Sequence, residues 1–359
     1  MVVFMTGASG AAGRAILDRL CDEPLVERVY ALVHRSALPS AGAKVRAVQG
    51  TISAGGTLGL DPETARLVTA EATAVLHAAA DTRFDAPIEI LRAVNVEGTL
   101  RVLDWARQVA GLDRVLVLST VYVAGRRTGR ITEDDLIHDA GFVNHYERSK
   151  YEMEEALADC RDVPVAVARL STIVGDSRDG RVARSAAFHH ALRLYYQSLA
   201  PMLPGTPDSP VDLIPLDYAA DAVVTLLCRE YRAGARWHVC AGDDAPCLDE
   251  LLDLAIEAFL ASRPAWRRRA IARPAIVPLS AFDRFADSVE ELGDTALSAA
   301  TRSVRPFAPQ LAYPKWFDET AARGRLAAHG IVPAPFREYF PRVVDHLIRT
   351  HWSGAQVPA

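Results

Sequence analysis

A glycine-rich segment near the start of the chain constrains the fold more than any other feature. It runs from Gly7 to Gly13, directly after the apolar run Val2–Met5 and directly before a helical pattern. Glycines in a strand–turn–helix unit let the backbone approach a pyrophosphate, which then faces the N-terminus of the helix. The sequence therefore predicts a dinucleotide site that includes Gly7, Ser9, Gly10, Ala11, Ala12 and Gly13.

Short apolar runs alternate with helical patterns over the first half of the chain. The predicted strands are Val2–Met5, Val29–Val33, Val45–Gln49, Ala74–His77, Val115–Ser119 and Val165–Leu170, with Trp237–Cys240 returning late to the sheet. The predicted helices include Ala11–Leu20, Ile88–Gln108 and Tyr146–Cys160. Such alternation is typical of a parallel sheet with helices on both faces. We therefore predict an α/β fold with a Rossmann-type doubly wound parallel sheet.

A smaller, mainly helical region is expected to cover the substrate. The segment 175–180 has the composition of a loop, the proline-rich stretch Ala200–Pro215 is predicted to be irregular, and helical patterns dominate after Cys240. We assign residues 1–175 plus 211–245 to the Rossmann domain. Residues 176–210 plus 246–359 form the predicted substrate-binding and C-terminal helical region.

Composition excludes several classes of function. The formal net charge of −5 is unfavourable for a nucleic-acid partner. The five cysteines form no Cys-x-x-Cys pair, and His189-His190 lacks a partner at metal-ligand spacing, so we predict no metal site. No apolar run is long enough to span a membrane, and the chain starts with a strand rather than a signal peptide. A cytoplasmic enzyme is the expectation.

Tyr146 and Lys150 are one helical turn apart, which places them on the same helix face. Tyrosine can protonate a carbonyl oxygen, and a nearby ammonium lowers its ordinary pKa of about 10. Ser119 and Thr120 end a predicted strand, where open α/β sheets bind their ligands. We predict that Thr120 holds the carbonyl oxygen, with Ser119 as the alternative. The pattern indicates hydride transfer with a nicotinamide cofactor.

The end of the second predicted strand indicates which cofactor is used. An NAD site carries an acidic residue about 20 residues after the glycines. Here the segment reads Leu32-Val33-His34-Arg35-Ser36, without a carboxylate. Arg35 suits a 2′-phosphate, with His34 or Ser36 assisting, so we predict NADPH.

Four segments together resemble the extended short-chain dehydrogenase/reductase superfamily: Thr6–Gly13, His77–Ala80, Asn95–Thr99, and Tyr146 with Lys150. The resemblance is closer to the thioester reductases and fatty acyl-CoA reductases, whose domain is of the male-sterility NAD(P)-binding type. It rests on the segments Ser119–Gly125, Tyr146–Tyr151, Gly175–Gly180 and Pro215–Ala222. It covers residues 1–245 well and returns around Phe317–Gly330.

This resemblance implies roles for individual residues. Tyr146 would donate the proton, Thr120 would hold the oxygen, and Lys150 would lower the pKa of Tyr146 and bind the nicotinamide ribose. Asn95 matches a residue that supports the proton relay or only braces the sheet. Thr51 stands where relatives carry an aspartate that contacts adenine. The remaining cofactor contacts that it implies are Ala78, Ala79, Ala80, Ser119, Leu170, Ser171 and Thr172.

The implied reaction is the NADPH-dependent reduction of an acyl thioester, bound to CoA or to a carrier protein, to an aldehyde or alcohol. Arg263, Arg267–Arg269 and Arg273 form a basic cluster that is either a solvated face or a dock for an acidic acyl-carrier protein. Alternatives are a ketone or aldehyde reductase, a nucleotide-sugar epimerase or dehydratase, and a non-catalytic NADPH-binding regulator. Relatives often form homodimers, which the sequence leaves open.

Three further residues have predicted local roles. His77 is expected to be structural, because buried histidines more often pack than react. Asp217 is expected to be the N-cap of a helix over Tyr218–Cys228. Arg178 either contacts a substrate phosphate or closes its own loop.

Overall fold

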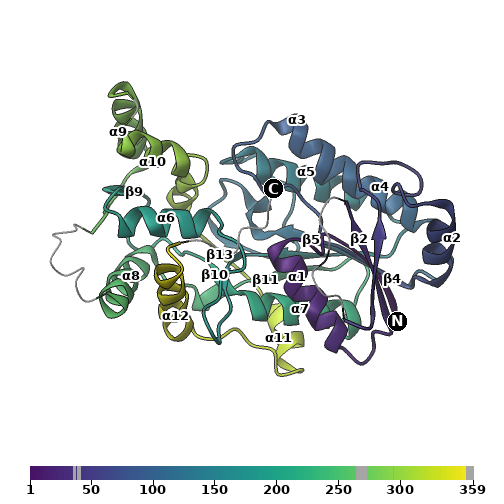
Figure 1. Ribbon diagram of the computed structural model, residues 1–359. Coiled ribbons are helices and arrows are strands. Elements are labelled where there is room, and N and C mark those ends of the chain that lie inside the picture. The colour runs from purple at the N-terminus through teal and green to yellow at the C-terminus, as the bar shows by residue number, and fades with distance from the viewer. Residues whose placement is uncertain (35–37, 39–41, 264–272, 294, 353–359) are drawn as a thin grey trace.

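The computed structural model describes residues 1–34, 38, 42–263, 273–293 and 295–352. Within them, seven parallel strands form the central sheet, in the order β11-β7-β5-β4-β1-β2-β3 (Figure 1). The chain starts in the middle of the sheet and winds outward in both directions, so the predicted Rossmann-type fold is confirmed. The strands are β1 (Val2–Thr6), β2 (Arg28–Val33), β3 (Val45–Gln49), β4 (Ala74–His77), β5 (Arg114–Thr120), β7 (Val165–Leu170) and β11 (Arg236–Val239).

Helices cover both faces of this sheet (Figure 1). On one face lie α1 (Ala11–Asp22), α7 (Leu216–Cys228) and α11 (Thr320–Ala327), whose buried side chains share one core with the strands. On the other lie α2 (Pro62–Glu71), α4 (Glu97–Ala106) and α5 (His145–Ala158). There the ring of Trp105 packs against Phe4 of β1, with centroids 4.1 Å apart.

The helix predicted over Ile88–Gln108 is interrupted. It consists of α3 (Ile88–Leu91), a π-helical turn over Arg92–Val96, and α4. A π turn inserts one extra residue into a helix, often at a functional site. Here the turn carries Asn95, whose side chain contacts the backbone of Asp81 and the hydroxyl of Ser149. The extra residue therefore serves to connect two neighbouring elements.

A second region lies beyond the carboxyl ends of the strands. Its main core joins α6 (Ala187–Tyr196), α8 (Leu248–Ser262) and α12 (Phe336–Arg349), while α9 (Leu279–Glu291) and α10 (Ala296–Val304) project away from the sheet (Figure 1). The core also takes Val174 and Leu213 from the segments assigned to the Rossmann domain. The division into 1–175 plus 211–245 and 176–210 plus 246–359 stays a prediction.

The prediction that Ala200–Pro215 is irregular is wrong in part. This stretch contains β9 (Met202–Pro204) and β10 (Leu213–Pro215). Each pairs in parallel with a distant strand, β9 with β12 (Ala275–Val277) and β10 with β8 (Thr172–Gly175). Such short strands depend on partners far away in the sequence, so the local composition does not reveal them.

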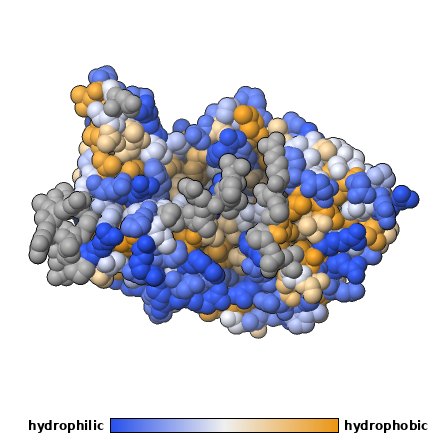
Figure 2. All heavy atoms as spheres, viewed as in Figure 1, coloured by the Kyte–Doolittle hydropathy of each residue, from blue (hydrophilic) through white to orange (hydrophobic). Residues whose placement is uncertain are grey.

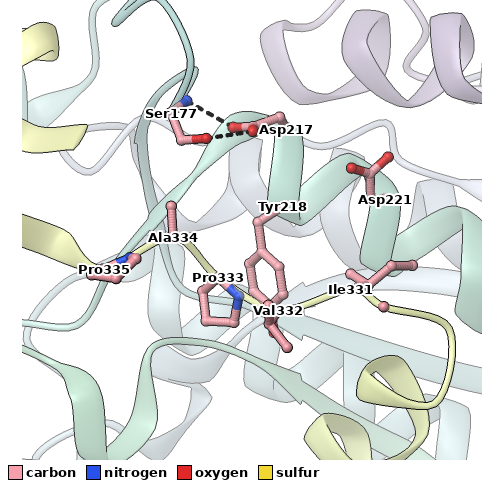
Figure 3. Close-up of a pocket in the computed structure, with 10 residues that line it drawn as sticks. Ser177, Asp217, Tyr218, Asp221, Ile331, Val332, Pro333, Ala334 and Pro335 are labelled. Carbon is pink, nitrogen blue, oxygen red and sulfur yellow. Dashed lines mark hydrogen bonds between the residues drawn. The ribbon is translucent and has the colours of Figure 1, made fainter. Parts of the chain in front are cut away.

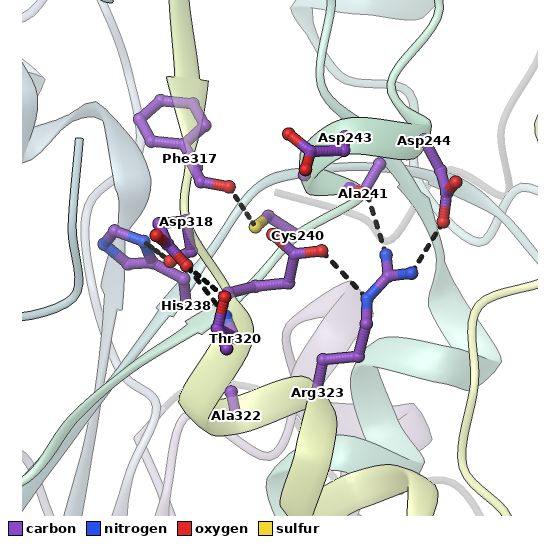
Figure 4. A network of polar contacts seen from close by, with 12 residues as sticks. His238, Cys240, Ala241, Asp243, Asp244, Phe317, Asp318, Thr320, Ala322 and Arg323 are labelled. Atoms are coloured by element: carbon purple, nitrogen blue, oxygen red, sulfur yellow. Dashed lines mark hydrogen bonds and ion pairs between the residues drawn. The ribbon is translucent and has the colours of Figure 1, made fainter. Parts of the chain in front are cut away.

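The last third of the chain returns to the Rossmann domain through β13 (Lys315–Phe317). This strand pairs in parallel with β6 (Gly129–Ile131), in the register Lys315 with Gly129. Arg323 of α11 then donates to the Asp244 carboxylate at 2.6 Å and to the Ala241 carbonyl at 2.9 Å (Figure 4). These contacts fix the returning segment beside the end of β11.

Candidate active site

A cavity of about 860 Å³ lies at the carboxyl ends of the central strands. Its wall includes Gly7 after β1, Ala78 after β4, Thr120 at the end of β5 and Ser171 after β7. Open α/β sheets bind their ligands at this edge. Figure 2 shows a hollow with apolar residues in its depth, between the projection of α9 and α10 and the part that carries α3 and α5.

The glycine loop forms one end of the cavity. Gly7 has a φ of +76°, and a Cβ there would lie 2.4 Å from the carbonyl carbon of Ala78. A Cβ on Gly13 would lie 2.0 Å from the Gly7 carbonyl oxygen. Among the described side chains none caps α1 at Gly10, so the N–H groups of its first turn stay available to an anion. The loop therefore fits a dinucleotide pyrophosphate.

His77 connects this loop to the helices behind it. Its Nδ1 lies 2.8 Å from Thr6 Oγ1, and its Nε2 lies 2.9 Å from Thr99 Oγ1. Because Thr99 donates to the carbonyl oxygen of Asn95, it must accept from Nε2–H, which assigns the neutral tautomer. Burial, with the nearby charge of Lys150, lowers the pKa of His77 to about 3. His77 is therefore structural, as predicted.

Thr120, Tyr146 and Lys150 all line the cavity. Asn144 is the N-cap of α5, its side chain accepting from Glu147 N, and this places Tyr146 in the first helical turn. The Thr120 hydroxyl lies near enough to Tyr146 to lower the pKa of its phenol. Lys150 is buried one turn later, and its Nζ donates to the Leu118 carbonyl of β5 at 2.7 Å. The three predicted side chains therefore line one cavity, Thr120 from the end of β5 and the other two from α5.

The expected lowering of the pKa of Tyr146 is not found. Burial raises it above its ordinary value, Glu147 raises it further, and only the nearby Thr120 hydroxyl lowers it. Burial lowers the pKa of Lys150 itself to about 8. Tyr146 therefore keeps its proton at neutral pH, which suits a proton donor.

Ser119, the alternative to Thr120, has a different partner. Its hydroxyl donates to Glu154 Oε1 at 2.6 Å. The Glu154 carboxylate forms a fully buried ion pair with Arg169, at 2.8 Å between Nη2 and Oε2. Arg169 Nη1 donates to the Glu133 carbonyl and contacts His238 Nε2, both at 3.2 Å. Ser119 thus also lines the cavity, but its hydroxyl is engaged by a buried network.

Most of the other predicted cofactor residues also line the cavity. These are Gly7, Gly10, Ala11, Ala12, Gly13, Ala78, Ala80, Leu170, Ser171 and Thr172. The wall does not include Ser9, His34, Thr51, Ala79 or Asn95. Arg35 and Ser36 lie outside the described residues.

Asn95 and Thr51 have local partners in place of a cofactor contact. Asn95 is fully buried, and its amide is engaged by Asp81 and Ser149. Of its two predicted roles, the structure favours bracing. Thr51 Oγ1 accepts from Ser53 N within a turn.

The prediction that Asp217 caps a helix is wrong. Helix α7 begins at Leu216, with Pro215 at the N-cap, so Asp217 lies in the first turn. Its carboxylate accepts from the N–H and hydroxyl of Ser177, at 2.8 and 2.6 Å (Figure 3). Arg178 closes the same loop by donating to Asp176 at 2.9 Å. Loop closure, rather than phosphate contact, is the role that these contacts support.

The described residues include only Arg263 and Arg273 of the predicted basic cluster. Arg267–Arg269 lie outside the described residues, while Arg273 contacts the carboxylates of Asp249 at 2.7 Å and Asp253 at 3.0 Å. A carrier-protein dock at this cluster stays a prediction.

Across the described ranges, no helix has the length and apolar character needed to cross a membrane. Within the same ranges, no cluster of His, Cys, Asp and Glu has the arrangement of a metal site.

The sequence reasoning missed a polar group next to Tyr146. Glu147, Gln310 and Lys315 line the cavity, and Gln310 bridges the other two, accepting from Lys315 Nζ at 2.8 Å and donating to Glu147 Oε1 at 2.9 Å. Lys315 and Gln310 lie where the family resemblance is weak. The signal that was available is the scarcity of lysine in this chain.

The far part of the cavity is apolar. Its wall is formed by side chains of α6, α8, α10 and the segments between them, including Leu192, Leu203, Leu251, Val304 and Phe307. Ligand cavities commonly combine such an apolar wall with a few polar groups that fix orientation. The cavity therefore has a nucleotide end, a polar centre at Tyr146 and an apolar chamber.

The fold and this site define a nicotinamide-dependent oxidoreductase of the extended short-chain dehydrogenase/reductase type. A family model of NAD-binding domains, described as male sterility protein, matches residues 37–223. The chain belongs to this family, as its motifs indicate.

Individual relatives agree with this assignment. The nonribosomal peptide synthetase cpsA of Aspergillus campestris is 28% identical over 274 residues, which cover 66% of this chain and 25% of that protein. The fatty acyl-CoA reductase wat of Drosophila melanogaster is 24% identical over 143 residues, which cover 33% of this chain and 28% of that protein. The chain thus spans about a quarter of the length of these curated relatives.

A solved structure is similar along nearly the whole chain. The terminal R domain from the myxalamid PKS-NRPS biosynthetic pathway superimposes with a TM-score of 0.78 at 22% identity. The match covers 99% of this chain and 92% of that domain. This likeness supports the fold.

Proposed function

We propose that this chain reduces an acyl thioester, carried by CoA or by a carrier protein, to an aldehyde or alcohol, with NADPH as the reductant. The observation that carries the proposal is the placement of Tyr146 and Thr120 in one cavity between a glycine loop and an apolar chamber. That chamber suits an acyl chain, because it removes apolar surface from water. The relative named a fatty acyl-CoA reductase supports the substrate class.

The residues at the nucleotide end fit a nicotinamide dinucleotide. The close packing of Gly7 against Ala78 and the uncapped start of α1 leave room and N–H donors for its phosphates. Lys150 would hold the nicotinamide ribose. The choice of NADPH rests on Arg35 and Ser36 in the sequence, and on the absence of a carboxylate there. When bound, the cofactor supplies a hydride.

The side chains of this protein would act on the thioester carbonyl oxygen. Thr120 and Tyr146 would donate hydrogen bonds to this oxygen and stabilise the negative charge that develops when the carbonyl carbon becomes tetrahedral. Breaking the C–S bond then releases the thiol and leaves the aldehyde. In a second reduction, Tyr146 would give its proton to the alkoxide and yield the alcohol.

The proposal is tested by following NADPH absorbance with acyl-CoA and acyl-pantetheine thioesters, beside matched aldehydes and ketones. We expect oxidation that depends on the thioester and releases one thiol per acyl group reduced. Parallel runs with NADH test the choice of cofactor. Turnover of aldehydes or ketones without thiol release would contradict the proposal and indicate an ordinary carbonyl reductase.

A further inference from the structure

Lys315 brings a second buried ammonium group into the cavity. Only three of the 40 lysine and arginine side chains are lysines, namely Lys44, Lys150 and Lys315. Two of these three line the same cavity, although the chain uses arginine almost everywhere else. A lysine ammonium is compact and shifts its pKa readily when buried, whereas a guanidinium stays charged and needs more room. The choice of lysine at residue 315 therefore points to a role in the cavity.

The position of Lys315 depends on long-range pairing. It is the first residue of β13, whose register with β6 sets Lys315 opposite Gly129. The side chain is 5% exposed, and its Nζ lies 5.8 Å from the centre of the Tyr313 ring. The polar network around Arg323 holds the segment that follows (Figure 4). The ammonium is thus held in place from both sides.

The Lys315 ammonium has unused hydrogen-bond donors, whereas the neighbouring Glu147 carboxylate already accepts three hydrogen bonds. Among the described residues, the only hydrogen-bond partner of Lys315 Nζ is Gln310 Oε1. An ammonium carries three donors. The Glu147 carboxylate, by contrast, accepts from Gln310, from Asn144 Nδ2 at 3.0 Å and from Val143 N at 3.1 Å. The Lys315 ammonium can therefore still donate hydrogen bonds to a ligand in the cavity.

A buried donor without a partner is costly, and a ligand that supplies an acceptor relieves that cost. Burial lowers the pKa of Lys315, and the charge of Glu147 opposes that shift. Burial also raises the pKa of Glu147, and Lys315 and the hydrogen bonds from Val143, Asn144 and Gln310 oppose that rise. Glu147 lines the same cavity as Tyr146, and its charge raises the pKa of the Tyr146 phenol, so the cluster lies close to the proposed reacting centre. The chamber beyond is apolar.

We propose that Lys315, oriented by Gln310 and Glu147, forms a subsite that binds an amide or keto carbonyl oxygen of the acyl-thioester substrate near its reacting carbonyl. This inference rests on the proposed function. The carbonyl belongs either to the acyl group or to the pantetheine arm, since both offer the same acceptor. A plain alkanoyl chain on a simple thiol offers neither.

Four thioesters distinguish these sources. The acyl group is an N-acetylaminoacyl group or an alkanoyl group of equal length, and the thiol is pantetheine or ethanethiol. With Lys315→Met, we expect the ratio of kcat/KM between carbonyl-bearing and plain substrates to fall roughly 10- to 100-fold, the range for a hydrogen bond to a charged group. The pair of substrates that shows the fall identifies the source. Lys44→Met is the control, since Lys44 Nζ donates to the Glu23 carbonyl and Lys44 is not part of the cavity wall.

Binding of unreactive thioether analogues to the wild-type protein gives a second readout that depends on neither turnover nor the folding of a variant. We expect the carbonyl-bearing analogue to bind at least about tenfold more tightly than its methylene counterpart. Equal binding, or an unchanged ratio in Lys315→Met, would overturn the subsite even if thioesters are reduced. Preferential binding without any reduction would instead reject the proposed function and keep the subsite.

Discussion

Ser119 donates its hydroxyl hydrogen to the Glu154 carboxylate across 2.6 Å, and Glu154 is fully buried. Thr120 is the next residue of β5, so its side chain leaves the strand on the opposite face, and it lines the cavity together with Tyr146. Two adjacent hydroxyl groups therefore have separate partners. One belongs to a buried network, and the other to the proposed reacting centre.

Removing each of these two hydroxyls in turn should affect turnover differently. Thr120→Val should lower kcat by about 10²- to 10³-fold, the usual effect of removing one oxyanion donor, and should cost about 0.5–2 kcal/mol of stability, because the Thr120 hydroxyl also accepts from Tyr122 N–H as an N-cap. Ser119→Ala should keep turnover within a few fold but lower the free energy of unfolding by about 1–3 kcal/mol, because Glu154 loses a donor. Thioester reduction and urea unfolding measure both. An equal loss of kcat in the two variants would contradict the assignment.

Removing the phenol hydroxyl of Tyr146 separates an enzyme from a regulator. Tyr146→Phe should reduce turnover by about 10²- to 10⁴-fold, since the proton donor is lost, while NADPH affinity is retained. Cofactor oxidation and a fluorescence titration of NADPH give the two values. Tyr231→Phe is the matched control, because that hydroxyl contacts the backbone of Val115 and Pro164. A regulator that merely binds NADPH would show the same behaviour in both variants.

Two helical glycines should respond differently to alanine. Gly13→Ala places a Cβ 2.0 Å from the Gly7 carbonyl oxygen, so we expect NADPH binding and stability to be lost together. At Gly324 in α11 a Cβ meets nothing within 4 Å, and alanine should stabilise the fold by about 0.4–1 kcal/mol. Calorimetric titration with NADPH and thermal unfolding test the pair. Normal binding by Gly13→Ala would refute the tight loop.

The buried pair of Arg169 and Glu154 should matter far more than an exposed one. Both side chains are inaccessible to solvent, so Arg169→Met leaves the Glu154 carboxylate with Arg236, at 3.6 Å, as its remaining cationic partner and should cost about 3–5 kcal/mol. Arg349→Met removes an exposed pair with Asp345 and should cost less than about 1 kcal/mol. Urea unfolding compares them. Similar midpoints for the two variants would argue against the buried network.

Glu133 gives a stability difference that depends on pH. Burial raises its pKa from 4.5 to about 6, so the folded protein favours the protonated form. The contribution of Glu133 is therefore fully present below pH 4.5 and is lost as the pH rises through 6, by about 2 kcal/mol in all. Relative to wild type, Glu133→Gln should become more stable over this window.

The variant also carries a cost that does not depend on pH, because its amide faces the N–H of Ala321, which now donates to Glu133. This cost lowers the free energy of unfolding of the variant equally at every pH and leaves its dependence on pH unchanged. Unfolding free energies at pH 4.5, 5.5 and 6.5 isolate the slope. A constant difference between variant and wild type would show that Glu133 does not titrate in this range.

The sequence predicts the central sheet well, because each strand is a continuous apolar run that can be recognised without knowing its pairing partner. Strands β3, β4 and β7 match their predictions residue for residue. The short strands β9 and β10 were missed because their pairing partners are distant. The π turn at Asn95 adds one residue without breaking the helical pattern, so hydrophobic spacing cannot reveal it.

The residues of the candidate site also differ in whether a local sequence signal reveals them. The structure places Thr120, Tyr146 and Lys150 in one cavity, and the strand end and the helix spacing make this placement predictable from the sequence. Lys315 has no such local signal, since only the pairing of β13 with β6 carries it into the cavity. The pKa of Tyr146 is raised rather than lowered because burial outweighs the effect of its neighbours, and the depth of burial cannot be read from the spacing of Tyr146 and Lys150.

The pairing of β6 with β13 also has a consequence for how this protein is made. Arg130 and Asp318, which form an ion pair beside this ladder, are 188 positions apart in the sequence. Contacts of such separation are slow to form, because a long loop must close first. During synthesis the Rossmann strands can assemble while the ribosome is still translating. The part of the cavity wall that β13 contributes, including Lys315, can form only after residue 315 has been synthesised.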